Sequence, residues 1–137
     1  MNNEEIIRNA YRLAEIKDVP SWVAGFTEDG TYTDESIGAV NRGPKEVGRP
    51  VEIYAKAFQD MHRELYKFYV TGDIVVVQLA LQGTHTISPT SKRMDAPCCD
   101  VFQLKDGKIQ RFGCYPSGAV IFSQLGLLTN LQAVPTH

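Results

Sequence analysis

The second half of the chain contains four runs of β-prone residues, and turn-forming residues separate each run from the next. The runs cover residues 62–70, 74–86, 94–104 and 109–115. The turn signals lie at residues 71–73, 88–90 and 105–108. Short turns between strands join neighbours in antiparallel order. The pattern therefore predicts an antiparallel meander of four strands.

Helical patterns dominate the first half of the chain. Residues 3–16 carry apolar side chains at helical spacing, with Asn2 and Glu5 available as a capping box. Asp18 and Pro20 favour a short second helix over residues 21–26, and Pro50 opens a third helix. Residues 28–30 are expected to form a turn, 31–34 a short strand and 37–48 a loop.

Helices that come first and strands that come last predict an α+β fold. We expect a curved antiparallel sheet wrapped around three N-terminal helices, and one domain over residues 1–137. Fourteen basic and sixteen acidic residues, with no basic stripe, make nucleic acid a poor partner. The polar N-terminus and the absence of an apolar run of about 18 residues argue against a membrane segment. We expect a soluble, cytoplasmic protein.

The sequence offers little for a metal or a nucleotide. Its three cysteines leave an odd thiol, and Cys98 and Cys99 are adjacent, so reduced thiols are expected. The histidines, His62, His85 and His137, do not show the paired spacing of a zinc site. No glycine-rich phosphate loop follows a strand. We therefore expect neither metal nor cofactor.

Strand parity identifies two candidate polar residues of an interior site. In the run 74–86 the odd positions are apolar and the even ones largely polar, so the odd face, which ends at His85, should point inward. A histidine satisfied at the frayed end of the strand is the alternative. In the next strand Cys98, Asp100 and Phe102 share one face. If that face is interior, Asp100 is a buried carboxyl group with a raised pKa, as an acid or base near neutral pH requires; otherwise Val101 faces inward and Asp100 is solvated.

Two further candidates and an aromatic set complete the predicted site. Asp34 ends its strand on the same face as Tyr32, where it could be a general base or cap the turn that follows. Tyr11 lies at the margin of the first helix's apolar stripe, where its hydroxyl could reach a pocket or water. The candidate substrate-binding residues are Trp22, Phe26, Tyr32, Tyr54, Phe58, Phe68, Cys98 and Phe112. They predict an apolar, dry cavity, although such a set can also be an ordinary core.

The chain resembles the SnoaL-like polyketide cyclases, a branch of the superfamily that includes nuclear transport factor two and the ketosteroid isomerases. The resemblance rests on the order of the elements, on residues 70–77 leading to Gly83-Thr84-His85-Thr86, on residues 99–109, and on the tail 123–127. It implies a cone-shaped, cystatin-like barrel. In the cyclases an aspartate at the place of Asp100 is the acid/base of an aldol closure, with a pocket histidine, here His85, beside it. The ketosteroid isomerases use a tyrosine and a protonated aspartate as oxyanion donors and a second aspartate as the base. By this resemblance Tyr11 and Asp100 would be the donors and Asp34 the base.

Two functions follow as hypotheses. The first is cofactor-independent acid/base catalysis, either aldol cyclisation or enolisation and isomerisation, on a hydrophobic polyketide- or terpenoid-like ketone. The second is a non-catalytic module that binds a small hydrophobic molecule or dimerises. We also expect a homodimer formed through the outer face of the sheet, at Val76, Ala80, Val101 and Gln103.

Overall fold

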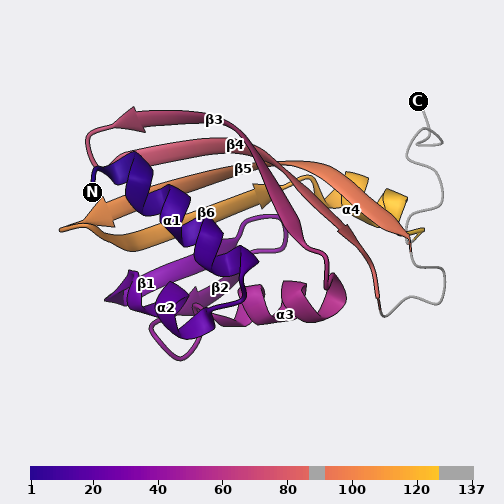
Figure 1. The fold of residues 1–137 in the computed structure, drawn as a ribbon, viewed down its shortest axis with the longest axis horizontal. Coiled ribbons are helices and arrows are strands. Elements are labelled where there is room, and N and C mark those ends of the chain that lie inside the picture. The colour runs from indigo at the N-terminus through magenta and orange to yellow at the C-terminus, as the bar shows by residue number, and fades with distance from the viewer. Residues whose placement is uncertain (87–91, 127–137) are drawn as a thin grey trace.

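The computed structural model describes residues 1–86 and 92–126, so the predicted turn at 88–90 and the last residue of the tail 123–127 lie outside the described residues. The elements are α1 (Asn3–Glu15), α2 (Val19–Ala24), β1 (Phe26–Asp34), β2 (Ala39–Arg42), α3 (Arg49–Ala57), β3 (His62–Thr71), β4 (Ile74–Thr84), β5 (Arg93–Lys105), β6 (Lys108–Pro116) and α4 (Gly118–Gln124). In Figure 1 the three N-terminal helices lie along the inner side of a curved sheet, as predicted.

The six strands form one sheet in the order β2-β1-β6-β5-β4-β3. Strands β3 to β6 pair antiparallel in sequence, which confirms the meander. Strand β1 pairs antiparallel with β2 but parallel with β6, a pairing that the sequence did not predict. After β2 the chain passes through α3 to the opposite edge of the sheet, and the meander then returns to β1 with its last strand running in the same direction (Figure 1).

The inner face of the sheet follows the predicted parity. Val75 and Val77 on β4 are fully buried, and Leu79 and Leu81 are almost so. Helix α1 covers this face with Ile7, Ala10, Tyr11 and Ala14, which share its apolar side. The Asn2 side chain caps the helix by accepting from the Glu5 peptide nitrogen at 2.9 Å. Among the described helices, none is long and apolar enough to span a membrane.

Several element boundaries differ from the sequence expectations. Helix α2 ends at Ala24, and Phe26 already belongs to β1. The predicted turn at 28–30 lies inside β1, where the pairing with β6 is irregular between Phe26 and Thr31. At Gly30 an added Cβ would come within 2.9 Å of the Thr27 carbonyl oxygen, so a glycine permits this bulge. The predicted loop contains β2, and α4 follows the last predicted strand.

Candidate functional site

Asp100 is a buried acidic side chain on the inner face of β5, with 3% of its surface exposed. The neighbours that share its face, Cys98 and Phe102, are buried as well, whereas Val101 is half-buried on the outer face. Asp100 lies opposite Val77 in the ladder between β4 and β5. Residues directly opposite one another share a face, so the buried alternative for Asp100 is the correct one.

Tyr11 and Asp100 form a hydrogen-bonded pair that joins α1 to the sheet. The Tyr11 hydroxyl donates to Asp100 Oδ2 at 2.5 Å, and both side chains are buried. The Tyr11 ring also meets Phe102 edge-on, with ring centres 5.8 Å apart. A short O–H···O contact of this kind is typical of a hydrogen bond to a carboxylate. Of the residues proposed from the sequence, these two are therefore brought together.

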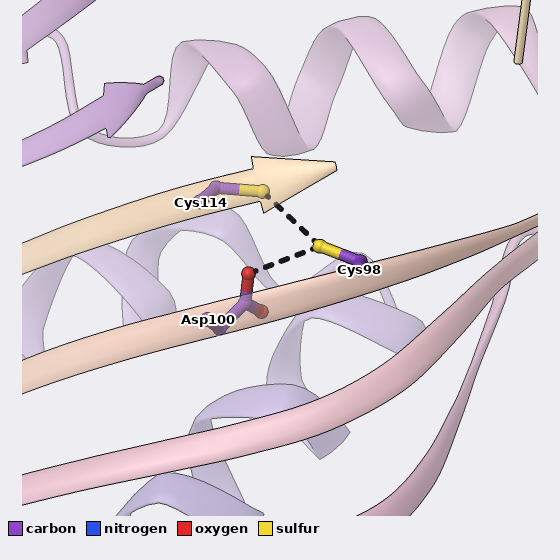
Figure 2. A group of neighbouring side chains, drawn as sticks. All are labelled: Cys98, Asp100 and Cys114. Atoms are coloured by element: carbon purple, nitrogen blue, oxygen red, sulfur yellow. Dashed lines mark hydrogen bonds between the residues drawn. The ribbon is translucent and has the colours of Figure 1, made fainter. Parts of the chain in front are cut away.

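Two thiols complete the surroundings of Asp100, as Figure 2 shows. Cys98 Sγ donates to Asp100 Oδ1 at 3.3 Å and lies 3.7 Å from Cys114 Sγ on β6. The three side chains place one possible metal ligand each within 4.8 Å of one another. A soft metal ion could use these three donors, while a structural zinc site takes four. The expectation that the protein uses no metal remains a prediction.

The buried position controls the electrostatics of this cluster. Burial raises the pKa of Asp100, while the Tyr11 hydroxyl, the two thiols and the charge of Arg63 act in the opposite direction without cancelling it. Burial and the nearby Asp100 raise the pKa of Tyr11 well above its ordinary value. Tyr11 therefore stays a neutral donor, and Asp100 is the group that can take up and release a proton.

A small pocket opens onto this pair. Six of the residues proposed from the sequence line it: Tyr11, Trp22, Tyr32, Tyr54, Asp100 and Phe112. The rest of its wall consists of Val51, Met61, Arg63, Leu81 and Cys114. The space open to the centre of a water molecule is about 10 Å³, which is about what one water needs.

The described residues therefore enclose no deep apolar cavity in this conformation, and the expectation of one was wrong. Aromatic side chains fill the interior instead. The ring centres of Tyr32 and Phe112 lie 4.2 Å apart, and those of Phe102 and Phe112 lie 4.3 Å apart. Residue types alone cannot distinguish a lined cavity from a packed core, because both use the same aromatic set.

Four proposed substrate-binding residues do not line the pocket. Phe26 packs against Trp22 with ring centres 5.4 Å apart. Phe58 packs beneath Gly83, because a Cβ atom added to Gly83 would lie 2.9 Å from the Cβ atom of Phe58. Phe68 lies under the Arg8 guanidinium, 4.0 Å from the ring centre. Cys98 contacts Asp100 behind the pocket wall.

His85 and Asp34 lie away from the Tyr11–Asp100 pair. His85 follows the end of β4, is half-buried, and stacks edge-on against Phe58 with centres 5.3 Å apart. It comes eight residues after Val77, the partner of Asp100, or roughly 26 Å along an extended chain. The expected position of His85 beside Asp100 was therefore wrong. Asp34 accepts from the Ser36 peptide nitrogen at 3.0 Å and from its hydroxyl at 2.6 Å, as in the capping alternative.

Arg63 is the charged residue among the pocket residues that the sequence reasoning missed. It is half-buried between the exposed residues His62 and Glu64 on β3, so its side chain points inward. The alternation of Arg63, Leu65 and Phe68 with exposed neighbours was a signal, but a register irregularity between Leu65 and Lys67 weakens it. An inward arginine on an edge strand is difficult to recognise from such a pattern.

Comparisons with known proteins agree with this architecture. The family model of the SnoaL-like domain matches residues 7–112. A search of curated proteins finds no match. A hypothetical protein of ketosteroid isomerase-like fold from Catenulispora acidiphila, solved in complex with trimethylamine, is 22% identical, with a TM-score of 0.82 over 90% of this chain and 94% of that one.

Two further solved structures have similar folds. A proposed SnoaL-like polyketide cyclase from Shewanella putrefaciens is 11% identical, with a TM-score of 0.81 over 93% of this chain and 99% of that one. IdmH from Streptomyces antibioticus, a proposed polyketide cyclase, is 18% identical, with a TM-score of 0.79 over 92% and 99% of the two chains. At these identities the likeness establishes the fold and leaves the activity open.

Proposed function

The chain belongs to the SnoaL-like domain family, and from this premise we propose that it catalyses cofactor-independent acid/base chemistry on a small hydrophobic ketone. The observation that carries the proposal is the buried Asp100 carboxyl group, held by Tyr11 at the wall of the pocket. Aldol cyclisation and enolisation with isomerisation both begin with removal of a proton from the carbon next to a carbonyl group. Asp100 is the side chain placed to make that transfer.

The proposed reaction uses the pocket wall in two ways. Asp100 as carboxylate takes the proton from the carbon, which leaves an enolate. In an isomerisation Asp100 returns the proton to the far carbon of the shifted double bond. In an aldol cyclisation the enolate carbon adds to a second carbonyl group of the substrate, and Asp100 returns the proton to the alkoxide that forms. The hydroxyls of Tyr32 and Tyr54 are neutral donors that can stabilise the enolate oxygen, since burial raises the pKa of both. Asp34, which the resemblance assigns as base, binds Ser36 instead and has no role in this proposal.

A ketone must displace side chains to enter the pocket, because its free space is that of about one water molecule. Tyr54 on α3 and Met61 before β3 are half-buried members of the wall. We propose that these two side chains move outward when the ligand binds. The solved complex of the Catenulispora protein with trimethylamine supports the idea that a protein of this fold binds a small organic molecule.

The proposal can be tested without knowing the natural substrate. Cyclohexanone, 2-tetralone and a 3-oxosteroid are incubated with the protein in D₂O, and proton–deuterium exchange next to the carbonyl is followed by NMR. The wild type should accelerate exchange of at least one ketone, and Asp100→Asn should slow it by about 100-fold or more. Asp34→Asn is the matched control and should retain the wild-type rate.

The outcomes separate the enzyme from a binding module of the same fold. A ketone that binds the wild type without faster exchange would identify the non-catalytic alternative. Loss of exchange in Asp34→Asn, with Asp100→Asn unaffected, would move the base to Asp34. Circular dichroism of each variant checks that the fold persists.

The homodimer remains a proposal, and the surface suggested for it needs one change. Val76 and Val101 are half-buried and Gln103 is exposed, whereas Ala80 is only 4% exposed and cannot contribute. The aromatic residues Tyr69 and Tyr115, 48% and 51% exposed, extend the same outer face. Light scattering at micromolar concentration should show a dimer that Val101→Glu dissociates. A monomeric wild type would contradict the proposal.

A further inference from the structure

Arg63 contributes a guanidinium group to the pocket wall. Among the described residues, no hydrogen bond or ion pair involves it, although its charge lowers the pKa values of Asp100, Tyr32 and Tyr54 against the larger effect of burial. Arginine in a half-buried position usually pairs with a carboxylate or phosphate, because its fork of five donors matches these groups. The partner of Arg63 is therefore to be sought in a ligand.

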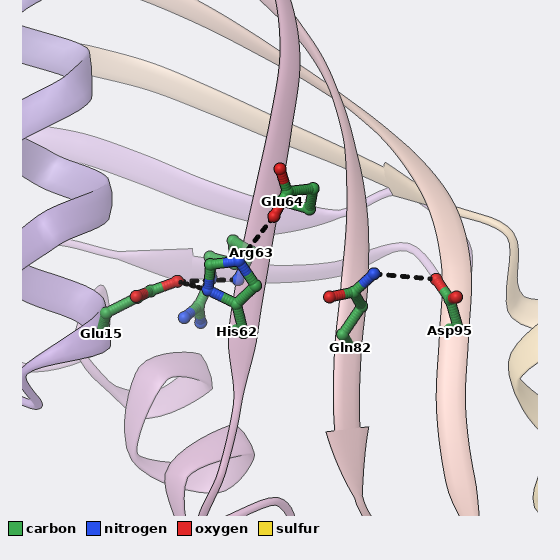
Figure 3. Close-up of polar contacts among 6 residues, drawn as sticks. All are labelled: Glu15, His62, Arg63, Glu64, Gln82 and Asp95. Atoms are coloured by element: carbon green, nitrogen blue, oxygen red, sulfur yellow. Dashed lines mark hydrogen bonds and ion pairs between the residues drawn. The ribbon is translucent and has the colours of Figure 1, made fainter.

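The nearest acidic side chain on α1 is already committed to other donors, as Figure 3 shows. Glu15 Oε1 accepts from the peptide nitrogen of Arg63 at 2.8 Å and from His62 Nδ1 at 2.7 Å. His62 also contacts Glu64 through Nε2 at 2.8 Å. These contacts hold the backbone of β3 against the end of α1. They fix the position of the Arg63 backbone but do not neutralise its guanidinium group.

The hydroxyls of Tyr32 and Tyr54 add two donors to the same wall. Tyr32 is only 5% exposed, and neither hydroxyl has a hydrogen-bond partner in the part of the chain that the structure describes. No fully buried side-chain oxygen or nitrogen lacks a partner there. Both hydroxyls therefore reach accessible space, which is the pocket that they line. The wall offers three donor groups and only one acidic acceptor, Asp100.

We propose that the pocket binds a small hydrophobic molecule that carries a carboxylate, and that Arg63 selects this group. One tyrosine hydroxyl can support the carboxylate, which leaves the other for the enolate oxygen of a keto acid. The inference rests on the proposed function only for the place of the ligand and holds whether or not Asp100 transfers a proton. It narrows the substrate class from ketones in general to keto acids or other apolar acids.

A ligand carboxylate on Arg63 changes the charge balance around Asp100. The groups that face Asp100 are Tyr11 from α1, Tyr32 from β1, Tyr54 from α3, Arg63 from β3, Cys98 from β5 and Cys114 from β6. Arg63 is the only permanent cation in this set, so neutralising it removes support for the Asp100 carboxylate. The bound acid adds a like charge. Binding should therefore raise the pKa of Asp100 further: a fraction of the molecules takes up a proton there, and the carboxylate that remains in the others is a stronger base.

Matched ligands test the inference directly. Cyclohexanecarboxylate and cyclohexanecarboxamide have almost the same shape but differ in charge, and calorimetry gives the affinity of each. The wild type should bind the carboxylate about tenfold more tightly or better. Arg63→Met should abolish this preference, Arg63→Lys should retain part of it, and the control Arg93→Met should retain all of it. Arg93 begins β5 and alternates with the inward-facing Met94, so it lies on the outer face of the sheet, with a side chain 60% exposed.

Proton uptake is read from the same titrations in two buffers of different ionisation enthalpy. The observed heat should depend on the buffer for the wild type and lose that dependence in Asp100→Asn. Equal affinities for the two ligands, an unchanged preference in Arg63→Met, or no saturable binding of the carboxylate at millimolar concentration would overturn the inference. Failure of the ketone exchange assay would leave the carboxylate preference intact, so the two proposals fail separately.

Discussion

Asp34 and Asp100 lie on the same row of the sheet, because Cys114 on β6 is the register partner of both. Two strand spacings separate their backbones, or roughly 10 Å. Asp34 ends β1 beside a turn, and its carboxylate is satisfied by Ser36. Asp100 lies within β5 under α1, and Tyr11 satisfies it instead. The comparison shows that coverage by a helix separates a buried carboxyl group with a raised pKa from one that supports a turn.

The largest effect on stability is expected from Tyr11→Phe, which removes the hydrogen bond to the buried Asp100 carboxylate. Loss of a hydrogen bond to a charged group should lower the free energy of unfolding by about 1.5–3 kcal/mol at pH 7. Tyr54→Phe is the matched control, since the Tyr54 hydroxyl has no partner among the described residues, and should cost far less. Urea unfolding of both variants measures the difference. Equal losses of unfolding free energy in the two variants would contradict the claim that the Tyr11 hydroxyl stabilises the fold more than the Tyr54 hydroxyl at the pocket wall.

The second prediction concerns pH and the buried carboxyl group. Burial raises the pKa of Asp100 in the folded protein, so the folded state binds this proton more tightly than the unfolded state, whose carboxyl group has a pKa of about 3.9. The resulting stability is fully present below that value and is lost as pH rises through the folded pKa. The free energy of unfolding of the wild type relative to Asp100→Asn should therefore fall as pH rises. A relative stability that increases with pH would contradict the raised pKa.

A smaller effect is expected at Asp34. Asp34→Ala removes the acceptor of two hydrogen bonds from Ser36 in an accessible turn, which should cost about 0.5–1.5 kcal/mol. Asp34→Asn keeps an amide oxygen that can accept the same bonds and should cost less. Unfolding in urea at pH 7 gives both values. A loss in Asp34→Ala that exceeds the loss in Tyr11→Phe would reverse the comparison of the two aspartates.

The smallest effect is expected at His62, which lies between acidic groups at the surface. Its hydrogen bond to Glu64 and the charge of Glu15 raise the pKa of His62, against a lowering by partial burial. The stability from this charge is fully present below the unfolded value of about 6.5 and is lost as pH rises through the folded pKa. Wild-type stability should decline modestly relative to His62→Gln between pH 6 and 8.5. Salt should weaken the effect, since nearly half of the His62 side chain is exposed.

The sequence predicted the inner face of β4 correctly but left β5 undecided, and the reason lies in their side chains. The odd positions of β4 are apolar, while the even positions include Gln78, Gln82 and Thr84, so burying the even face would be costly. Both faces of β5 carry apolar residues, so either orientation of Asp100 satisfied the pattern. The pairing of β5 with β4 decides between the two orientations, because it places Asp100 opposite the buried Val77.

Parity gave less information where a strand ended or its pairing became irregular. Strand β4 ends at Thr84, one residue before His85, yet His85 still packs against the buried Phe58. What parity could not give is its distance from Asp100 along the sheet. In β1 the residues at the irregular pairing have a composition typical of a turn, so the sequence did not identify them as part of the strand. The period of two describes a regular ladder only.

Local periodicity and turn chemistry were enough to predict the first three helices, the meander, the inner face of β4 and the family resemblance, but not β2 or α4. The pairing of Tyr11 with Asp100, 89 residues apart, was decided only by the tertiary structure. So were the filled interior and the Arg63 side chain at the pocket wall, whose guanidinium group has no partner among the described residues. Contacts between a helix and a distant strand depend on how the helix crosses the sheet and how closely the side chains pack, and no local pattern encodes either.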